Sequence, residues 1–406
     1  MSVKREQKEL QIPSAERETN VRRNVPNLRF AGFSGEWESR KIGEDCSVLM
    51  CKRIFAHQTL EQGDVPFYKI GTIGAEPDAY ISRELFEDYR AKYNYPREGE
   101  VMVTCAGTVG KTIVFNGDDS YYQDSNIVWL SNPKQLYLNS FLNYYLSRVN
   151  WNKLNSTTIT RIYNDNLREL IIKYPSVEEQ EKIVSLLSLL DQRIAVQNKV
   201  IEHYESLIRA IILRSQSSSS TRKVYLREIL TERKELNENG YDICSVSVSK
   251  GVVNQVEYLG RSFAAKETDH YHVVHKGDIV YTKSPTGEFP YGIIKQSYLN
   301  TPVAVSPLYG VYEPIDYLIG VYLHHFFYSP QNAKNYLHKL IQKGAKNTIN
   351  ITNQHFLDNL ISIPENNTLQ RIVGLIEILS TKIDLERELL SIYSKQKTFL
   401  LSSLFI

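Results

Sequence analysis

The chain has 406 residues, of which 42% are hydrophobic and 23% are charged, and its formal net charge at pH 7 is +2. This length leaves room for two or three domains, and the composition is that of an ordinary globular protein. A net charge this small excludes a uniformly basic surface, so a polyanionic partner would have to meet local patches. No apolar run approaches the ~20 residues that span a bilayer, and we therefore expect a cytoplasmic protein without membrane contact.

The first 24 residues are charged and lack the apolar core of a secretory signal, so we expect a disordered arm or tag remnant. Four cysteines follow along the chain, at 46, 51, 105 and 244. None forms a Cys-x-x-Cys pair, which argues against a zinc site and favours reduced thiols.

A first globular region is expected over residues 25–175. Two β-branched runs, at 101–104 and 112–115, flank the Gly-rich segment 106–110 and predict a β-hairpin. Apolar residues at helical spacing then predict a short helix over 137–145.

A long helix is expected from Val177 to about Arg214, within a spacer that we place at 176–215. Ser176 and Glu179 have the spacing of a capping box, in which the serine hydroxyl accepts a backbone amide and the glutamate reaches back. Beyond them, apolar residues advance in alternating steps of four and three, which is a heptad seam. Its members are Ile183, Leu187, Leu190, Ile194, Gln197, Ile201, Tyr204, Ile208 and Ile211.

A Ser-rich linker at 216–221 separates this helix from a second globular region at 222–365. The run 276–282 repeats the charged-Gly-acid-apolar order of 98–104 at an offset of 178. Residues 284–287 then fall at a hairpin tip, and 317–327 at a short helix. The second region therefore shares the frame of the first and differs from it at the tip.

The final segment, 366–406, repeats the long-helix pattern. Pro175 and Pro364, which precede the two helices, are 189 residues apart, and the seam repeats step for step at this offset. Each seam has one polar residue at its midpoint, Gln197 in the first helix and Glu386 in the second. If the helices pair, these two residues meet and act as a register pin.

The sequence thus predicts an α+β protein with two similar globular domains at opposite ends of an antiparallel two-helix coiled-coil rod, related by a pseudo-two-fold axis. Antiparallel pairing follows because compact domains usually have their termini close together. A helix over 176–214 gives a rod of roughly 58 Å at most. The alternative is that each helix packs only on its own domain, although a globular helix seldom keeps a heptad seam this long.

Two unlike heads held at a fixed separation suit a periodic ligand, and duplex DNA is the obvious one. Dimeric readers place their recognition elements about one helical turn, roughly 34–36 Å, apart. Because the heads differ in sequence, the expected site consists of two unlike half-sites and an unread spacer.

The tandem layout resembles the specificity subunit of type I restriction-modification systems. The resemblance rests on the Pro-Ser-Val-Glu-Glu-Gln run at 175–180 and on the opening Trp37-Glu38 with Lys41-Ile42-Gly43-Glu44. It covers nearly the whole chain from Val25 onward, and the second copy departs from it with Pro-Glu-Asn-Asn-Thr-Leu-Gln at 364–370. The resemblance implies that the heads are target recognition domains for double-stranded DNA. It also implies docking of two methyltransferase subunits on the helices, joined by restriction motor-nuclease subunits.

Three stretches come close to a catalytic, cofactor or metal motif, and each lacks a required residue or element. Cys105 to Thr112 ends in Gly-Lys-Thr like a P-loop, but the first glycine is missing and a β-branched run follows the lysine. Glu232 and Lys234 form half of a nuclease motif, although the nearest upstream aspartate falls in the rod helix. Three histidines at 270, 272 and 275 lack a further metal ligand. We therefore expect a non-catalytic chain without cofactor or metal.

DNA contacts are expected from polar and basic side chains at strand ends and on protruding loops. In the first head the candidates are Lys69, Thr72, Thr104, Thr108, Lys111 and Arg161. In the second head they are Arg261, Lys266, Thr282, Lys283, Ser284, Thr286, Lys343 and Lys346. For any one of these residues, solvated surface is an equally good explanation; only the matched set favours DNA.

Three rival functions stay open at this point. In the first, the chain reads DNA for a methylation-only or other complex. In the second, it is a scaffold whose globular domains bind peptides. The third rival, an enzyme hidden in the heads, is disfavoured by the missing motifs.

Overall fold

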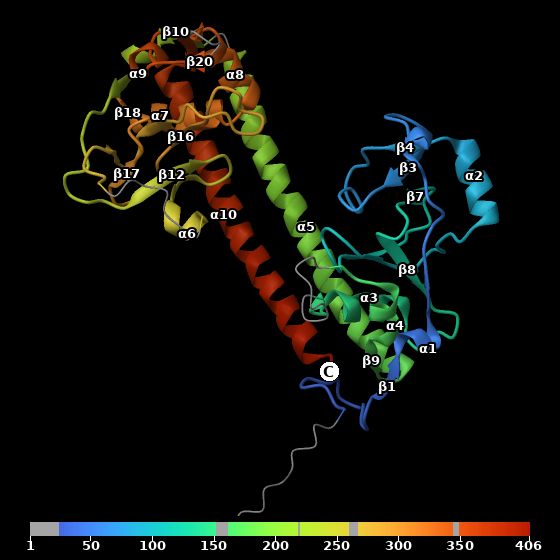
Figure 1. The fold of residues 1–406 in the computed structure, drawn as a ribbon. Helices are drawn as coiled ribbons and strands as arrows, with labels where there is room; N and C mark the ends of the chain where they lie inside the picture. Colours follow the sequence, from blue (N-terminus) through green and yellow to red (C-terminus); the bar gives the residue numbers. More distant parts are fainter. Residues whose placement is uncertain (1–23, 152–160, 218–219, 260–266, 344–348) are drawn as a thin grey trace, which may run out of the picture. The chain divides into compact units, whose positions relative to one another are not determined.

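A computed structural model describes residues 24–151, 161–217, 220–259, 267–343 and 349–406. The chain forms two compact units, the first comprising Met1–Ile194 with Ile392–Ile406 and the second Ala195–Ser391. Both long helices contribute to both units: α5 spans Val177–Gln216 and α10 spans Asn366–Ser403 (Figure 1). Each unit therefore combines a globular region with stretches of the two helices.

In its described residues the first unit contains three small sheets (Figure 1). Its strands are β1 Glu38–Lys41, β2 Ser47–Leu49, β3 Val65–Tyr68, β4 Tyr80–Ile81, β5 Val101–Thr104, β6 Thr112–Val114, β7 Tyr121–Tyr122, β8 Ile127–Ser131 and β9 Ile171–Tyr174. Its shorter helices are α1 Ile42–Asp45, η1 Ala56–Gln58, α2 Arg83–Lys92, α3 Asn139–Ser147 and α4 Asn164–Glu169. The sheet orders are β2-β8-β5-β6, β4-β3-β7 and β1-β9.

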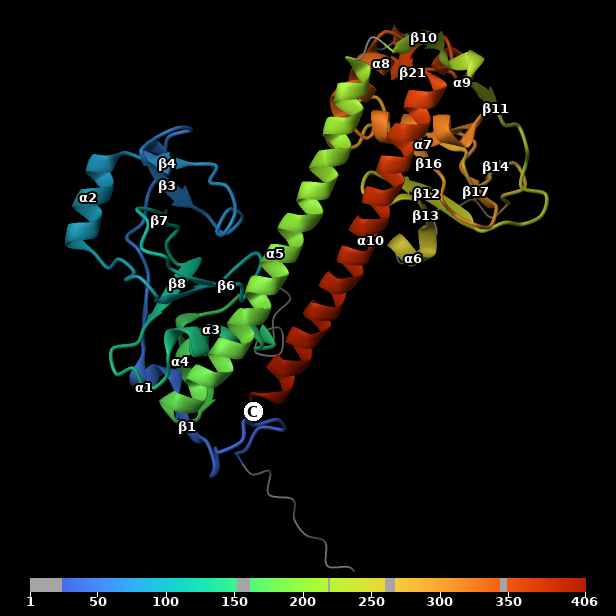
Figure 2. The same ribbon diagram turned by 180° about the vertical axis from the view of Figure 1, so that it is seen from behind.

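The second unit repeats this plan (Figure 2). Its strands are β10 Thr221–Tyr225, β11 Leu230–Glu232, β12 Ile243–Ser247, β13 Gly251–Asn254, β14 His272–Val274, β15 Ile279–Tyr281, β16 Ile294–Gln296, β17 Val303–Val305, β18 Gly310–Pro314, β19 Gln342–Lys343, β20 Ile349–Asn350 and β21 Leu360–Pro364. Its shorter helices are η3 Leu226–Glu228, α6 Gln255–Leu259, α7 Tyr317–Phe327, α8 Pro330–His338 and α9 Asn353–Phe356. The sheet orders are β11-β18-β15-β16, β13-β12-β17-β14, β10-β21 and β19-β20.

The duplication predicted from sequence is present in the strand order. The four-stranded sheet β2-β8-β5-β6 corresponds to β11-β18-β15-β16, and a two-stranded pair precedes each long helix. The predicted hairpins are β5–β6 and β15–β16, both antiparallel. The predicted short helices are α3, which begins two residues later than expected, and α7, which has the expected bounds.

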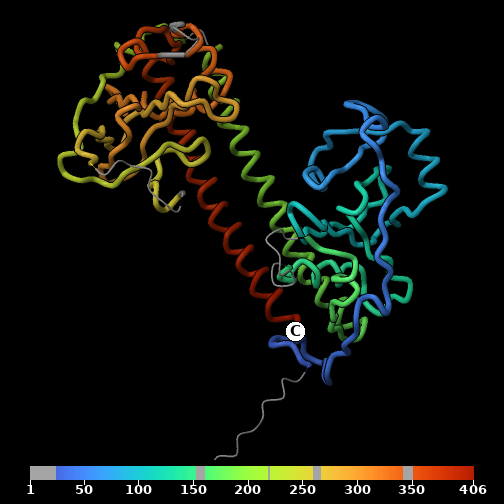
Figure 3. Tube along the Cα trace, viewed as in Figure 1, coloured from blue at the N-terminus to red at the C-terminus, as the bar shows by residue number. Residues whose placement is uncertain are grey.

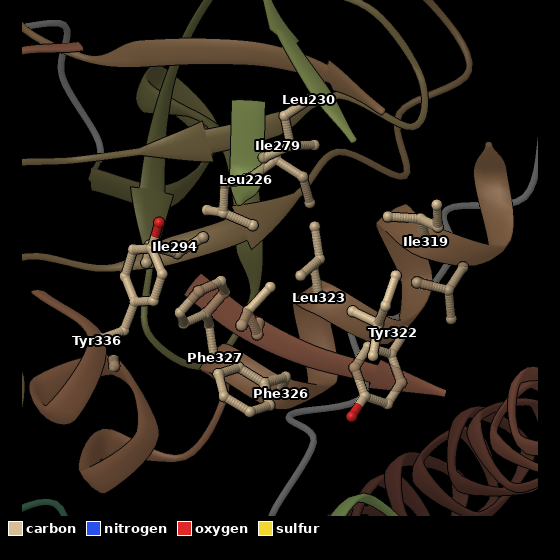
Figure 4. Packing of buried hydrophobic residues seen from close by; sticks show 14 of the residues in the cluster. Leu226, Leu230, Ile279, Ile294, Ile319, Tyr322, Leu323, Phe326, Phe327 and Tyr336 are labelled. Carbon is tan, nitrogen blue, oxygen red and sulfur yellow. The ribbon is translucent and has the colours of Figure 1, made fainter. Parts of the chain in front are cut away.

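The core of the second unit joins the sheet, α7 and both long helices. Leu323 and Phe327 of α7 point toward Ile279 and Ile294 of the sheet (Figure 4). Ile208 of α5 and several isoleucines of α10 belong to the same cluster. The long helices are therefore part of this core. Each fully buried side chain of this kind stabilises the fold by about 1.5–3 kcal/mol, so the helices contribute substantially to the stability of the unit.

The two long helices are antiparallel within each unit. In the second, β10 follows α5 and pairs with β21, which leads into α10. In the first, Asp191 contacts Lys397 at 2.5 Å and Arg193 contacts Tyr393 at 3.5 Å, so numbers rise along one helix and fall along the other. Figure 3 shows the C-terminal end of α10 beside the segment that precedes β1, where Leu28 N donates to Ser403 O at 2.9 Å.

The predicted seam of α5 is buried or half-buried along its length, Ile194 and Tyr204 being half-buried, and it shifts by one residue near the end of the helix. Ile183, Leu187 and Ile201 are buried, as expected, but after Ile208 the fully buried residue is Ile212 and not Ile211, which is half-buried. A straight helix with 3.6 residues per turn drifts against a repeat of 3.5, and this drift accounts for the shift.

Gln197 and Glu386 meet, as equivalent positions of an antiparallel pair should. Gln197 Nε2 donates to a carboxylate oxygen of Glu386 and lies 3.4 Å from the Glu386 carbonyl oxygen. Gln197 is buried and Glu386 half-buried. A polar pair inside an apolar seam penalises other registers, so a role as register pin stays our prediction.

Candidate nucleic-acid interface

The start of α5 is fastened to the first globular region by two polar side chains. Gln180 is fully buried; its Oε1 accepts from Leu138 N at 2.8 Å, and its Nε2 donates to Leu136 O at 3.0 Å. Glu179 accepts two hydrogen bonds from Arg29, at 2.8 and 2.7 Å. The predicted capping box, in which the Glu179 side chain reaches back to Ser176, is therefore wrong, because Arg29, 150 residues earlier, binds the Glu179 carboxylate.

The second copy uses an apolar contact at the same place. Leu369, which is 189 residues after Gln180, is 3% exposed and packs in the core of the second unit. Gln370, which the motif comparison placed near this position, is exposed. Each head is thus fixed to its helix by side chains that follow Pro175 or Pro364, with different chemistry in the two copies.

Two loops of the first unit form one polar surface beside the β5–β6 hairpin. Lys111 Nζ donates to Ile73 O at 2.6 Å, which joins the hairpin tip to the loop at 69–75. Thr108 and Lys111 are exposed at the tip. Lys69 contacts Asp78 at 2.9 Å, and both side chains are largely exposed. Exposed pairs of this kind are worth roughly 0–1 kcal/mol, so the ammonium can exchange to a phosphate.

Three of the first-head candidates form hydrogen bonds with backbone groups of the first unit. Thr72 Oγ1 accepts from Lys69 N at 3.0 Å and shapes the turn. Thr104 is fully buried, and its hydroxyl donates to Thr108 O and accepts from Lys111 N. Thr104 therefore holds the hairpin closed, and its prediction as a DNA contact is wrong. Arg161, half-buried, donates to Ser125 O at 3.3 Å.

A third loop at this surface was missed from sequence. Gln123 Oε1 accepts from Ile70 N at 3.3 Å, and Ser125 has a φ of +54°. Non-glycine residues with positive φ cost about 1–3 kcal/mol and gather at functional sites. The polar run between β7 and β8 was the available sign, because it follows two buried tyrosines and precedes a buried strand.

The second unit carries a longer hairpin connection at the equivalent place. Residues 105–111 join β5 to β6, whereas residues 282–293 join β15 to β16. Thr282 corresponds to Thr104, is 3% exposed and accepts from Ile293 N at 3.2 Å, so it too is a structural residue and not a DNA contact. Ser284 and Thr286 are exposed on a small loop closed by hydrogen bonds between Thr286 and Phe289.

The remaining second-head candidates are two lysines in described segments and three residues outside them. Lys283 is half-buried; burial lowers its pKa, which the nearby Glu232 partly offsets. Lys343 is in β19, paired with β20. Arg261, Lys266 and Lys346 lie outside the described residues.

The P-loop-like run folds as the predicted hairpin. Residue 112 begins strand β6, whereas a phosphate-binding loop requires a helix after its lysine. The histidines are used locally: His272 Nδ1 lies 3.1 Å from Tyr309 O, and His275 Nε2 lies 2.7 Å from a Glu235 oxygen. Within the described ranges, no cluster of three or more His, Cys, Asp or Glu side chains is arranged to hold a metal ion. In the same ranges no helix is apolar over a length that would cross a membrane.

Comparison with known proteins finds sequence similarity over about half of the chain. Residues 34–205 match the type I restriction modification DNA specificity domain. A putative type I restriction enzyme specificity subunit of Haemophilus influenzae is 43% identical over 190 residues, which are 47% of this chain and 46% of the relative. The match thus spans about half the length of this curated relative.

The similarity in fold extends over a larger part of the chain. The crystal structure of a type I restriction-modification S subunit from M. genitalium superposes with a TM-score of 0.57 and 17% identity. It covers 94% of this chain and 99% of that one, so the likeness includes both globular regions and both long helices. Residues 34–205 are thus similar to a type I restriction modification DNA specificity domain, and the chain as a whole shares the duplicated fold of that S subunit.

Proposed function

We propose that this chain reads a bipartite, asymmetric DNA sequence, with each globular region acting as the target recognition domain for one half-site. The observation that carries the proposal is the duplicated hairpin with unlike tips. The hairpins share their strands and the buried Thr104 or Thr282, while seven residues form one connection and twelve the other, 105–111 and 282–293. Two domains that share the hairpin strands but expose different side chains at the tips are suited to recognising different bases.

The side chains offered to DNA are those that project from these tips and the adjoining loops. In the first unit we assign Lys69, Thr108, Lys111 and Arg161 to this role, with Gln123 added from the structure. In the second we assign Ser284 and Thr286 from the described loop, together with Lys283. Lysine and arginine would position the phosphates, whereas hydroxyl and amide groups suit base edges.

The long helices supply a surface for methyltransferase subunits, of which we propose two. Large apolar side chains stay exposed outside the seam: Leu375, Ile378 and Leu385 in the second unit are 52–60% exposed, and Ile392 and Phe399 in the first are 54% and 62%. Exposed apolar rows of this kind mark protein-binding surfaces. Restriction motor-nuclease subunits would join the resulting complex in the cytoplasm.

In this account the chain itself is non-catalytic, and its partners supply the chemistry. The alternative of a DNA reader in a methylation-only complex uses the same interface and differs only in the partner subunits. The alternative of a peptide-binding scaffold differs in the ligand, and salt dependence separates it from DNA reading.

Fluorescence anisotropy of a labelled duplex with the full chain, in complex with its methyltransferase, provides the test. Phosphate contacts make the logarithm of affinity fall linearly with the logarithm of salt concentration, by about 0.9 for each neutralised phosphate. The double substitution Lys69→Met and Lys111→Met should weaken binding and reduce this slope by about 1–2. Lys395→Met, an exposed lysine on α10, serves as the control. An unchanged slope, or no binding to DNA, would favour the scaffold.

A further inference from the structure

The second unit contains a cavity between its globular region and the stretches of α5 and α10 that belong to the same unit. Its volume is about 820 Å³. Sites for small molecules usually measure about 300–1,000 Å³, so the cavity has the size of a ligand site. Its lining comes from strand β16 and helix α7, from the two long helices and from residues 249–251.

Lys295 of β16 lines this cavity and is 1% exposed. Its ammonium lies 3.9 Å from the centroid of the Tyr328 ring. Among the described residues no carboxylate lies within ion-pair distance of this ammonium. Burial lowers the pKa of Lys295 to about 8, so the side chain is still mostly charged at pH 7. A buried cation without a counter-ion is costly, and an anion in the cavity would remove that cost.

Two histidines of α7 add hydrogen-bond donors to the same lining. His324 Nδ1 accepts from Gln296 N at 3.0 Å, so the neutral ring carries its hydrogen on Nε2. Burial lowers the pKa of both His324 and His325, the latter to about 4, and the charge on Lys295 adds to the effect. Both rings are therefore neutral at pH 7 and each offers an N–H group.

The acidic groups of the cavity already have partners. Glu205 contacts Arg387 at 2.7 Å, Asp384 contacts the same guanidinium at 3.8 Å, and Glu377 accepts a hydrogen bond from Tyr317. The lining has four cations (Lys295, Arg387, Arg209 and Lys250) and three carboxylates, so its net charge with neutral histidines is +1, as 4 − 3 = 1. The positive charge left over in the lining favours the binding of an anion.

We propose that this cavity binds the phosphate group of a small phosphorylated ligand, with Lys295 as its counter-ion and the α7 histidines as donors. DNA phosphates are the other source of this chemistry, and competition with a duplex in the experiment below separates the two. Tyr298 and Tyr317 also line the cavity and are each 46% exposed, which leaves ring surface for the organic part of the ligand. The site goes beyond the proposed function, because DNA reading does not require it.

Isothermal titration of the full chain in complex with its methyltransferase tests the proposal. The probes are inorganic phosphate, ATP as a phosphorylated compound of suitable size, and sodium chloride at equal ionic strength. We expect one saturable site per chain for at least one phosphorylated probe. Lys295→Met should weaken this binding by about tenfold or more, since a buried charge-assisted contact is lost. Lys276→Met, on an exposed lysine bonded to Asn300, should bind as the unaltered chain does.

The outcomes separate cleanly. If Lys295→Met does not fold, Arg209→Ala, at a lining residue of α5, gives a milder test, with a severalfold loss expected. Absence of binding by every phosphorylated probe would overturn the proposal, as would equal binding by Lys295→Met. A random-sequence duplex that displaces the small probe would also overturn it, by identifying DNA as the phosphate source. Duplex binding that persists in Lys295→Met keeps this site distinct from DNA reading.

Discussion

Replacing Arg29 by methionine is expected to destabilise the first unit by about 3–5 kcal/mol. The guanidinium makes two hydrogen bonds to Glu179, whose side chain is 2% exposed, while that of Arg29 is 15% exposed. Removal of one partner leaves a buried carboxylate without compensation, which is the costly case for a buried ion pair. At 2–4 °C for each kcal/mol in a unit of this size, the midpoint of its thermal unfolding should fall by about 6–20 °C.

Two further variants determine whether the ion pair is the cause. The double variant Arg29→Met with Glu179→Met should recover most of the loss, because replacing both partners by apolar groups is close to neutral. Arg40→Met removes an exposed arginine whose contacts with the carboxylates of Glu38 and Asp45 are long, at 3.9 and 4.0 Å, and should leave the melting temperature nearly unchanged. If Arg29→Met alone were as stable as the unaltered chain, the ion pair between Arg29 and Glu179 would contribute little to stability.

Gly292→Ala should destabilise the second unit by about 3 kcal/mol or more. Gly292 has a φ of +101°, and a Cβ atom there would lie 1.8 Å from the carbonyl oxygen of Thr282. That oxygen belongs to the backbone at the base of the β15–β16 hairpin, so relief of the clash requires the hairpin to open. Calorimetry should show the unfolding midpoint of this unit lowered by about 6–12 °C.

Gly287→Ala is the matched control for this variant. Gly287 has a φ of +51° in the same connection, but a Cβ atom there meets nothing within 4 Å. It should therefore cost only about 1 kcal/mol, from the left-handed backbone alone. Equal effects of the two substitutions would mean that the hairpin base adjusts freely, contrary to the close approach of Thr282.

The parts of the fold that follow local periodicity could be predicted from the sequence. A seam of alternating steps predicted both α5 and α10, and the polar midpoint of each seam predicted that Gln197 and Glu386 would meet if the helices pair. The antiparallel direction was predicted separately, from the expected closeness of the termini of a compact domain. The hairpins followed from β-branched runs around glycine. These features depend on residues near each other in sequence, or on a repeat that makes distant segments comparable.

The errors arise where a distant or geometric fact decides the role of a side chain. Glu179 has the spacing of a capping residue, yet Arg29, 150 residues earlier, takes its carboxylate. Thr104 and Thr282 were expected to face DNA because they end strands, but their hydroxyl groups hold the hairpins from inside. Ser125 escaped notice because a serine with positive φ has no local sequence pattern.

The cavity at Lys295 was equally invisible in the sequence. Strand β16 gives no sign that its central lysine is buried, since an alternating strand usually turns such a residue to solvent. Both faces of β16 are covered here, and the residues that meet the lysine come from α7, α5 and α10. Only the assembled unit brings these groups together.

The most direct test of the central claim is methylation-sensitive sequencing of DNA from a host that carries this chain with the proposed methyltransferase, compared with the same host lacking the chain. The account predicts a methylated motif of two unlike half-sites around an unread spacer, present only with the chain. A contiguous or palindromic motif, or a bipartite motif that persists without the chain, would contradict it.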